Sequence, residues 1–303
     1  MPLVPRADDD TLRVVQLNVG SLLEPHWDRR RHEVVAWLDR LDPDVVCLQE
    51  IWEADDQPCT AEWLVEHAGG RARWDWRFGG HPMPEPLWPD RTLRFGSAIL
   101  TRWPVERHEL ISLPYDADHP DPRFRFQNEL LHVRSAGVDV YSTHLSAAPL
   151  QAYNRRREVV AIDEAIRATS DAAAPLPPVL CGDFNAEPGA DEIRFLGALT
   201  DIDGHWAYYR DAWAAAGNPG PGITADPHTN PACRALNVPP KRIDYVFLGD
   251  AFLRPNGAGQ VRRAELVFDE PLTGILASDH YGLVVDVVWP DRPPTPGAPG
   301  APG

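Results

Sequence analysis

The chain has 303 residues, of which 43% are hydrophobic and 24% are charged, the composition of an ordinary soluble globular protein. Its formal net charge of −16 disfavours binding to a long nucleic-acid duplex through phosphate contacts. No run of about 18 apolar residues is present, so the sequence predicts no transmembrane segment.

The start of the chain and its cysteines give an expectation about the compartment. The first residues contain no apolar segment of the kind that a secretory signal requires. The four cysteines form no CxxC pair, and Cys47 and Cys181 lie inside apolar runs, which is typical of small core residues. We therefore expect a cytoplasmic, reduced monomer without disulfides, and a secreted mature form stays open as the alternative.

The first half of the chain alternates short strands with helices. Residues 1–10 are polar, and we expect them to be disordered. Arg29, Arg30 and Arg31 are interpreted as the exposed side of the first helix. The apolar periodicity predicts, in chain order, a strand over 12–20, a helix over 28–40, a strand over 45–48, a helix over 60–68 and strands over 74–78 and 94–101.

The second half contains paired strands and one long helix. Two Pro-rich loops, 79–90 and 217–240, are long enough to indicate a functional or mobile role. The Pro- and Gly-rich tail over 290–303 is expected to be disordered. The predicted elements are a hairpin over 124–133 and 138–143, helices over 149–169 and 190–196, and strands starting at Val179 and over 241–248, 261–268 and 283–289.

The stretch from Val179 to Pro188 carries the strongest single signal. An apolar strand runs into Gly182 and then presents Asp183 and Asn185. Residues two apart in an extended chain point to the same face, so a carboxylate and an amide lie side by side at the end of a buried strand. Such a pair suits a metal-bound water or an oxyanion, but Asp, Asn, Gly and Pro are also the usual turn formers.

Polar side chains follow other predicted strands in the same way. A carboxylate such as Glu50 at the end of a buried strand is costly unless it is paired or binds a metal. Oxygen-rich clusters favour Mg²⁺ or Mn²⁺ over Zn²⁺, whereas caps and turns alone are the simpler alternative for each residue taken singly. The candidates from six strand ends are Asn18, Glu50, His144, Asp183, Asn185, Asp244, Asp279 and His280.

The motifs that contain these residues resemble those of the endonuclease/exonuclease/phosphatase superfamily of divalent-metal phosphoesterases. The resemblance implies one catalytic domain over residues 11–289. It also implies a four-layer α/β sandwich, in which two packed mixed β-sheets are flanked by helices. The motifs, in the superfamily's order, are Gln16-Leu17-Asn18, Leu48-Gln49-Glu50, Gly96-Ser97-Ala98-Ile99-Leu100, Thr143-His144-Leu145, Gly182-Asp183-Phe184-Asn185, Arg242-Ile243-Asp244-Tyr245 and Ser278-Asp279-His280-Tyr281.

The resemblance further implies a metal site. Glu50 would be the principal ligand of Mg²⁺ or Mn²⁺, aided by Asn18 and Asp279. Asp183 would hold or activate the attacking water, and a second metal at this residue stays open. Phosphoryl transfer depends on positioning and on neutralising charge, so a cation that polarises a phosphate oxygen suits this chemistry.

The remaining site residues would transfer a proton and bind phosphate. The resemblance implies that His280 acts as general base or acid and that Asp244 orients it, because a His beside a carboxylate keeps one tautomer and gains basicity. Asn185 and His144 would bind the phosphoryl oxygens as charge builds in the transition state. No Ser or Cys nucleophile is required.

The motifs also narrow the expected branch of the superfamily. The segments around His144 and His280 resemble sphingomyelinase-like and deoxyribonuclease-like members more than abasic-site endonucleases. The deoxyribonuclease branch places a Glu beside its first His, and the sequence around Gly96 and Ser97 contains no carboxylate. We therefore expect hydrolysis of a small or lipid-like phosphoester, either a diester or a monoester.

Two alternative functions stay open. One is a nuclease for single-stranded or short DNA or RNA, and the other is a catalytically silent binding module of the same fold. A nuclease could stack bases on tryptophans, although core positions are the simpler explanation for three of them, and these tryptophans are Trp74, Trp76, Trp88 and Trp103. Substrate contacts are predicted at Arg125, Asn230 and Arg242, where salt bridges explain the charged side chains equally well.

Overall fold

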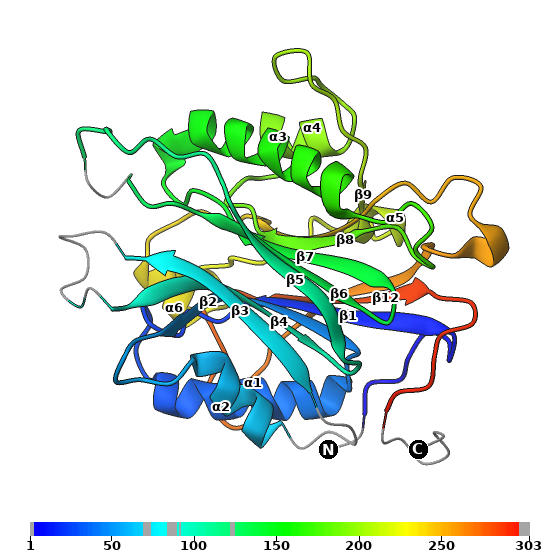
Figure 1. Ribbon diagram of the computed structural model, residues 1–303. Helices are drawn as coiled ribbons and strands as arrows, with labels where there is room; N and C mark the ends of the chain where they lie inside the picture. Colours follow the sequence, from blue (N-terminus) through cyan, green and yellow to red (C-terminus); the bar gives the residue numbers. More distant parts are fainter. Residues whose placement is uncertain (1–2, 69–73, 84–89, 91, 122–124, 297–303) are drawn as a thin grey trace.

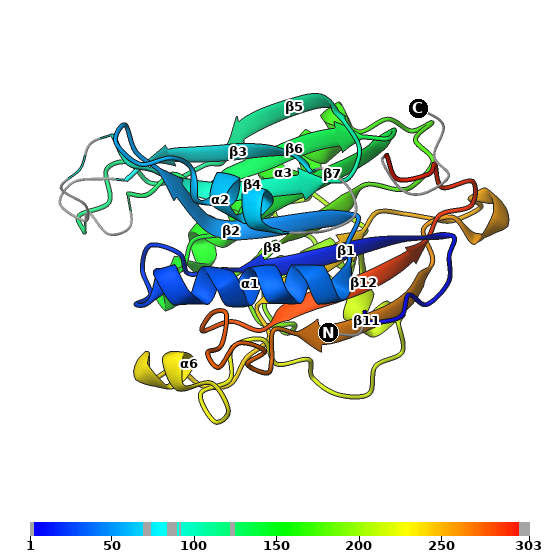
Figure 2. The ribbon, with the colours of Figure 1, turned by 90° about the horizontal axis from the view of Figure 1, so that it is seen from below.

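The protein is described by a computed structural model over residues 3–68, 74–83, 90, 92–121 and 125–296. Within these residues, two six-stranded sheets pack face to face and helices cover their outer sides (Figure 1). Figure 2, seen from below, looks onto the first sheet with α1 in front of its strands. The four-layer α/β sandwich expected from the sequence is confirmed. Among the described residues, no helix combines the length and the apolar character needed to cross a bilayer.

The first sheet has the strand order β11-β12-β1-β2-β4-β3. Strands β1 and β2 are parallel, and the other neighbours are antiparallel. Helices α1 (Trp27–Leu41) and α2 (Thr60–His67) cover its outer face (Figure 1). The strands are β1 (Thr11–Asn18), β2 (Val45–Glu53), β3 (Asp75–Pro82), β4 (Arg94–Thr101), β11 (Val261–Val267) and β12 (Gly282–Val288).

The second sheet has the strand order β5-β6-β7-β8-β10-β9, in which only β7 and β8 are parallel neighbours. Its strands are β5 (Val105–Ser112), β6 (Glu129–Ser135), β7 (Val138–His144), β8 (Val179–Asp183), β9 (Arg210–Asp211) and β10 (Asp244–Leu248). The remaining helices and helical turns of the chain, in order, are η2 (Pro149–Gln151), α3 (Ala152–Thr169), α4 (Asp191–Leu196), α5 (Ala212–Ala215), α6 (Pro231–Ala235) and η3 (Pro255–Gly257).

Side chains that alternate along the strands produce these layers. In β1, Val14 enters the apolar core between the two sheets, whereas Val15 packs in the core beneath α1. Both are fully buried, because a central strand is covered on both faces. Helix α1 contributes an apolar stripe at helical spacing, with Val34, Leu38 and Leu41 directed to the same core.

The face between the sheets changes from apolar to polar toward one end. Along β1, Leu12 and Val14 belong to the core between the sheets, and the alternation places Gln16 and Asn18 on the same face. Along β8, the apolar positions lead in the same way to Asp183. The candidate site therefore forms where several strands end together and their inward-facing residues become polar.

Most predicted elements are confirmed, with several corrections, among them that β3 continues to Pro82, inside the loop predicted over 79–90. The sequence does not predict β5, an edge strand whose side chains are mostly exposed. The strand expected to end at Glu50 continues to Glu53. Strand β6 begins at Glu129 rather than at residue 124, and the loop over 217–240 contains the short helix α6.

The buried aromatic residues weaken one basis of the nuclease alternative. Trp74 and Trp103 are buried, with 6% and 5% exposure, and Trp76 packs against the core under α1 and α2. These residues therefore do not form a base-stacking surface, and Trp88 lies outside the described residues. The described cysteines are all free and buried, and Cys47 and Cys181 are core residues as predicted.

The described parts of both chain ends contact the body of the domain. Arg6 and Arg292 both bind the carboxylate of the buried Asp44. Trp103 Nε1 donates to the Pro294 carbonyl at 3.1 Å. The sequence predicts disorder over 1–10 and 290–303, whereas these contacts hold the inner part of each end on the domain.

Replacing Gly182 by Ala should destabilise the fold by about 2 kcal/mol, because added atoms in a filled core force backbone shifts. A Cβ at this position would lie 2.3 Å from the backbone oxygen of Thr143 on the neighbouring strand. Thermal unfolding measures the change. Gly189→Ala is the matched control, because its Cβ would meet nothing within 4 Å. Equal unfolding temperatures for both variants would contradict the close approach of β7 and β8.

Candidate active site

His280 and Asp244 form a buried hydrogen-bonded pair at the polar end of the sandwich. His280 precedes β12, Asp244 begins β10, and His280 Nδ1 lies 2.9 Å from Asp244 Oδ2. Burial alone would lower the pKa of His280, but the carboxylates of Asp244 and Asp279 outweigh it and raise this pKa well above its ordinary value. Because Nδ1 is committed to Asp244, only Nε2 can exchange a proton with a ligand.

Asp183 ends β8 and faces three other predicted site residues. Its Oδ2 lies 3.5 Å from His144 Nε2, 3.8 Å from His280 Nε2 and 3.1 Å from Asn18 Nδ2. The parallel register of β7 and β8 pairs His144 directly with Asp183. Ligand atoms of Asp183, Asp244 and His280 all lie within 4.8 Å of one another, which makes them a compact group of residue types that hold metal ions.

Glu50 reaches the site through a bulge in β2. The pairing of β2 with β4 shifts register between Leu48 and Ile51, and Glu50 has a φ of 59°. A bulge re-aims a side chain, and a non-glycine residue in this left-handed region is uncommon. Asn18 Nδ2 lies 3.1 Å from Glu50 Oε1. Burial, with a further contribution from Asp279, raises the pKa of Glu50 above its ordinary value.

Glu24, which the sequence analysis missed, lies beside Asp279. Glu24 Oε2 accepts a hydrogen bond from the Asp279 backbone N–H at 3.0 Å, and Ser278 Oγ donates to Glu24 Oε1 at 3.2 Å. Burial and then the Asp279 carboxylate raise the pKa of Glu24 to about 9. Burial would also raise the pKa of Asp279, but the His280 imidazole and Glu24 lower it. Glu24 follows no predicted strand, so the strand-end pattern could not find it.

Arg30 is a second residue whose role the sequence analysis missed. It was expected on the exposed side of α1, but it is only 4% exposed. Its guanidinium donates to the carbonyl groups of Val19, Gly20 and Ala277 at 2.7, 2.8 and 2.8 Å. These bonds join the loop that follows Asn18 at the end of β1 to the loop before β12, which carries Asp279. Arg30 Nη1 also lies 3.8 Å from Glu24 Oε1.

Asn185 is fixed next to the ends of β7 and β8. Its φ is 49°, a left-handed conformation that Asn adopts more readily than most residues. Its backbone N–H donates to Asp183 Oδ1 at 2.9 Å, and its Nδ2 donates to the Leu145 carbonyl at 3.0 Å. The structure thus places Asn185 beside Asp183 and the strand of His144, but through a left-handed turn rather than the extended chain that the sequence predicts.

Asn230, which the sequence analysis predicts as a substrate contact, has both of its polar side-chain atoms bonded inside the protein. It is fully buried, and its Oδ1 accepts from the Ala232 backbone N–H at 3.0 Å, which caps α6. Its Nδ2 donates to the Ser278 carbonyl at 2.9 Å. Both polar groups are used inside the protein, so Asn230 positions the loop that carries Asp279 and His280.

The two predicted arginine contacts also have other partners. Arg242 pairs with Asp211 at 2.6 Å and lies over the ring of Tyr245 at 4.8 Å. Arg125 is exposed, and its Nε donates to the His119 carbonyl at 2.7 Å. The charged groups of Arg125 and Arg242 thus bind partners outside the polar cluster, and their role as substrate contacts stays a prediction.

A buried carboxylate lies beside Ser97, although the sequence around Gly96 and Ser97 contains none. Glu129, at the start of β6, has its Oε1 at 3.1 Å from Ser97 Oγ on the opposite sheet. Local sequence could not identify this pairing, because 32 positions separate the two residues. Burial raises the pKa of Glu129 to about 8, so this carboxyl keeps its proton in the folded protein at neutral pH.

Glu129→Gln should remove a pH dependence of stability. The pKa of Glu129 is about 8 in the folded protein against 4.5 ordinarily, so rising pH between these values favours the unfolded chain. The free energy of unfolding of the variant, relative to wild type, should rise by about 3 kcal/mol from pH 5 to pH 8. Denaturant titrations at both pH values measure this. Glu109→Gln, at an exposed position of β5, is the control, and equal slopes for both variants would contradict the burial argument.

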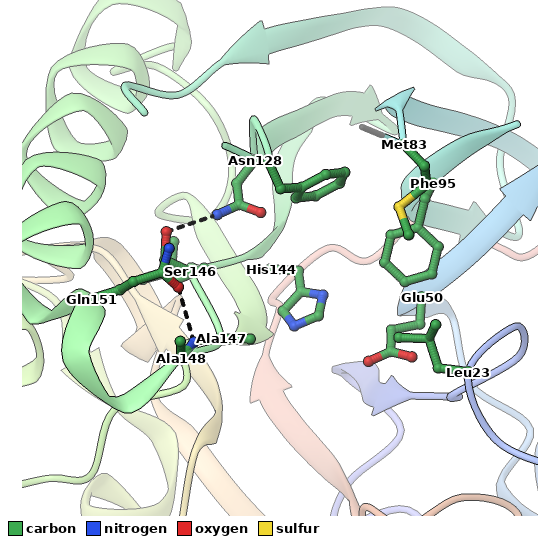
Figure 3. A pocket seen from close by; sticks show the side chains of 12 residues that line it. Leu23, Glu50, Met83, Phe95, Asn128, His144, Ser146, Ala147, Ala148 and Gln151 are labelled. Atoms are coloured by element: carbon green, nitrogen blue, oxygen red, sulfur yellow. Dashed lines mark hydrogen bonds between the residues drawn. The ribbon is translucent and has the colours of Figure 1, made fainter. Parts of the chain in front are cut away.

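An open pocket of about 430 Å³ adjoins the cluster, and Glu50 and His144 are part of its lining. Figure 3 shows these two side chains facing one another across the pocket. Apolar groups form much of the remaining wall. They come from Leu23, Met83, Phe95, Phe126, Leu145, Ala147 and Ala148.

The acidic residues fit a hard divalent cation. Glu50, Asp183 and Asp279 bring three carboxylates to one end of the sandwich, and burying negative charge there is costly without compensation. Glu24 lies beside Asp279. The nearby Arg30 directs its N–H groups mainly at backbone carbonyls. Carboxylate and amide oxygens at this density suit Mg²⁺ or Mn²⁺.

Solved structures support the fold assignment. The structure is similar to truncated TDP2 from Caenorhabditis elegans, with a TM-score of 0.64, 18% identity and coverage of 92% of this chain and 98% of that chain. It is similar to the human Nocturnin catalytic domain with bound sulfate, with a TM-score of 0.64, 20% identity and coverage of 94% of this chain and 96% of that chain. It is also similar to Danio rerio TDP2 complexed with a single-strand DNA product, with a TM-score of 0.66, 20% identity and coverage of 92% of this chain and 99% of that chain.

The family model gives the assignment for the sequence itself. Identities of 18 to 20% to the solved structures indicate a common fold and nothing finer. No curated protein matches the sequence. The model of the Endonuclease/Exonuclease/phosphatase family matches residues 15–280, which span the strand ends from Asn18 to His280. The chain belongs to the endonuclease/exonuclease/phosphatase family.

Proposed function

We propose that the protein is a divalent-metal-dependent hydrolase of a small or lipid-like phosphoester, with water as the nucleophile. Members of its family are phosphoester hydrolases and are usually metal-dependent. The observation that carries the proposal is the meeting of His280, Asp244, Asp183 and Glu50, from four separate strands or loops, at one end of the sandwich. Phosphoryl transfer requires this combination of a proton carrier with sites for a cation.

Glu50, Asn18 and Asp279 are the proposed metal ligands, and Asp183 is a further one. A divalent cation held there would neutralise the charge that develops on the phosphoryl oxygens. The chain supplies the remaining steps. Asp183 accepts a hydrogen bond from the attacking water and orients it toward phosphorus. Asn185 and His144 hold the phosphoryl oxygens beside it.

His280 is the proposed proton carrier. Asp244 fixes its Nδ1, so its Nε2, which lies 3.8 Å from Asp183, exchanges the proton with water or the departing oxygen. The surrounding carboxylates stabilise the protonated imidazole, which favours a role as proton donor or as a positive charge beside the phosphate. A base role requires that a bound cation first offset these carboxylates.

A nuclease for short or single-stranded nucleic acid is the second candidate. The Danio rerio TDP2 structure that this fold resembles contains a single-strand DNA product, which is the specific observation in its favour. The net charge of −16 and the absence of Lys and Arg from the described lining of the pocket favour the small phosphoester.

Hydrolysis of bis(4-nitrophenyl) phosphate tests the proposal. We expect turnover with Mg²⁺ or Mn²⁺ that is lost on adding a chelator and restored by excess metal. A labelled single-stranded oligonucleotide is the parallel substrate. Cleavage of the oligonucleotide without turnover of the small ester would favour the nuclease. If neither substrate is hydrolysed with either metal, the proposed hydrolase activity is contradicted. The catalytically silent binding module is then the remaining hypothesis.

A further inference from the structure

The pocket beside Glu50 and His144 has an apolar wall and a polar floor. Phe95 and Phe126 meet edge to face, with ring centroids 6.1 Å apart, and Met83 lies next to Phe95 (Figure 3). Leu23, which is 58% exposed, adds an apolar side chain to the rim. An exposed apolar residue next to a reactive centre is unfavourable in water, and a ligand that covers it would recover that free energy.

A buried carboxylate fixes the orientation of Asn128 on the floor of this pocket. Asn128 is 4% exposed, and its Nδ2 donates to Glu158 Oε1 at 2.8 Å and to Ser146 Oγ at 3.2 Å. Ser146 binds the same carboxylate through its Oγ and its backbone N–H, at 2.7 and 3.1 Å. Glu158 accepts three hydrogen bonds here, which prevents an amide flip that would turn the Asn128 oxygen toward it.

The fixed amide leaves Asn128 Oδ1 as an acceptor on the pocket side. In Figure 3 the nitrogen of Asn128 is directed to Ser146, and its oxygen lies on the opposite side of the amide, toward Phe95. Within the part of the chain that the structure describes, no hydrogen bond to this oxygen is formed, so a ligand that brings a donor can add one. The pocket thus combines apolar contact with one directed hydrogen bond.

We propose that this pocket binds an apolar ester group of the substrate, alkyl or aryl, that carries one hydroxyl or N–H group for Asn128 Oδ1. The inference rests on the proposed function, because the pocket touches the cluster at Glu50 and His144. Its described lining contains no Lys or Arg, so it offers nothing to a second phosphate. A polynucleotide carries a phosphate on both sides of each internal nucleotide. It therefore fits this pocket less well than a single apolar group does.

Binding of phosphonates by calorimetry in the presence of Mg²⁺ tests the apolar part independently of turnover. Phenylphosphonate should bind at least about tenfold more tightly than methylphosphonate, because the ring removes apolar surface from water. Leu23→Ser and Phe126→Ser should both bring this ratio toward one. Phe252→Ser, at an exposed position of another loop (78% exposed), is the control and should keep the full ratio.

Four results would overturn the inference. They are equal binding of phenyl- and methylphosphonate, a ratio that survives both pocket variants, binding of neither phosphonate, and much tighter binding of thymidine 5′-monophosphate than of phenylphosphonate. The last would assign the pocket to a nucleotide. Failure of phosphoester turnover with the phenyl preference intact would instead overturn the proposed function and leave the pocket assignment.

A series of hydroxybutyl phosphonates tests the hydrogen bond to Asn128. At least one of the 2-, 3- and 4-hydroxybutyl compounds should bind about fivefold more tightly than butylphosphonate, the usual gain from one good hydrogen bond. Asn128→Leu should abolish this margin. Equal binding of all four compounds to the wild-type protein would overturn the role of Asn128 whether or not the variant folds.

Discussion

Glu50→Gln should lower kcat/KM for a phosphodiester by at least about a thousandfold, while it raises the unfolding temperature of the metal-free protein. The activity falls because Gln keeps the shape of Glu50 but removes the charge that would hold a divalent cation. The stability rises for an electrostatic reason. The pKa of Glu50 is raised in the folded protein, so its ionised form at neutral pH disfavours folding.

The response to metal separates these effects from misfolding. Mn²⁺ should raise the unfolding temperature of wild type, because a ligand that binds only the folded state stabilises it, and Glu50→Gln should lose most of this response. Glu53→Gln is a matched control on the same strand, where Glu53 pairs with Arg94 at the surface. An unchanged Mn²⁺ response in Glu50→Gln would refute the assignment of Glu50 as a metal ligand.

Asp244→Asn should lower kcat by about a hundredfold to ten-thousandfold, the range expected when a general acid or base loses its orienting partner. His280→Gln should lower it by a similar factor, and the double variant should be little worse than either single variant because the two side chains act as a unit. Asp191→Asn, at an exposed position of α4, is the control and should keep full activity.

The titration of His280 gives a readout that a purely structural role of Asp244 would not change. In the metal-free protein, NMR should detect a pKa of His280 well above the ordinary value, since Asp244 is the largest of the contributions that raise it. Asp244→Asn should shift this pKa downward. An unshifted titration, or one that is already ordinary in wild type, would argue against the pair as the proton carrier.

The fold could be predicted where burial produces a period in the sequence. The first four residues of β2 are covered on both faces and form a continuous apolar run, and α1 shows a helical stripe. β5 shows neither pattern, because an edge strand with mostly exposed side chains needs no apolar period. The bulge at Glu50 could not be predicted from the sequence either, because it depends on the pairing of β2 with β4.

The site could be predicted as far as its residues lie at strand ends. Asp183 ends β8, Asp244 begins β10 and His280 precedes β12, and these three residues meet as expected. Glu24 and Arg30 lie in a loop and on a helix, and only the folded chain brings them to Asp279 and the site loops. Asn230 was identified, but as a ligand contact, because sequence does not distinguish an amide that binds substrate from one that binds a backbone carbonyl.

The central claim is that carboxylates from distant parts of the chain share one divalent cation. Crystals grown with Mn²⁺ test it most directly through anomalous diffraction. The account predicts a peak in contact with the carboxylates of Glu50 and Asp279, beside Asp183. A peak bound elsewhere on the protein, or density in that position for a side chain and no metal at saturating Mn²⁺, would contradict it.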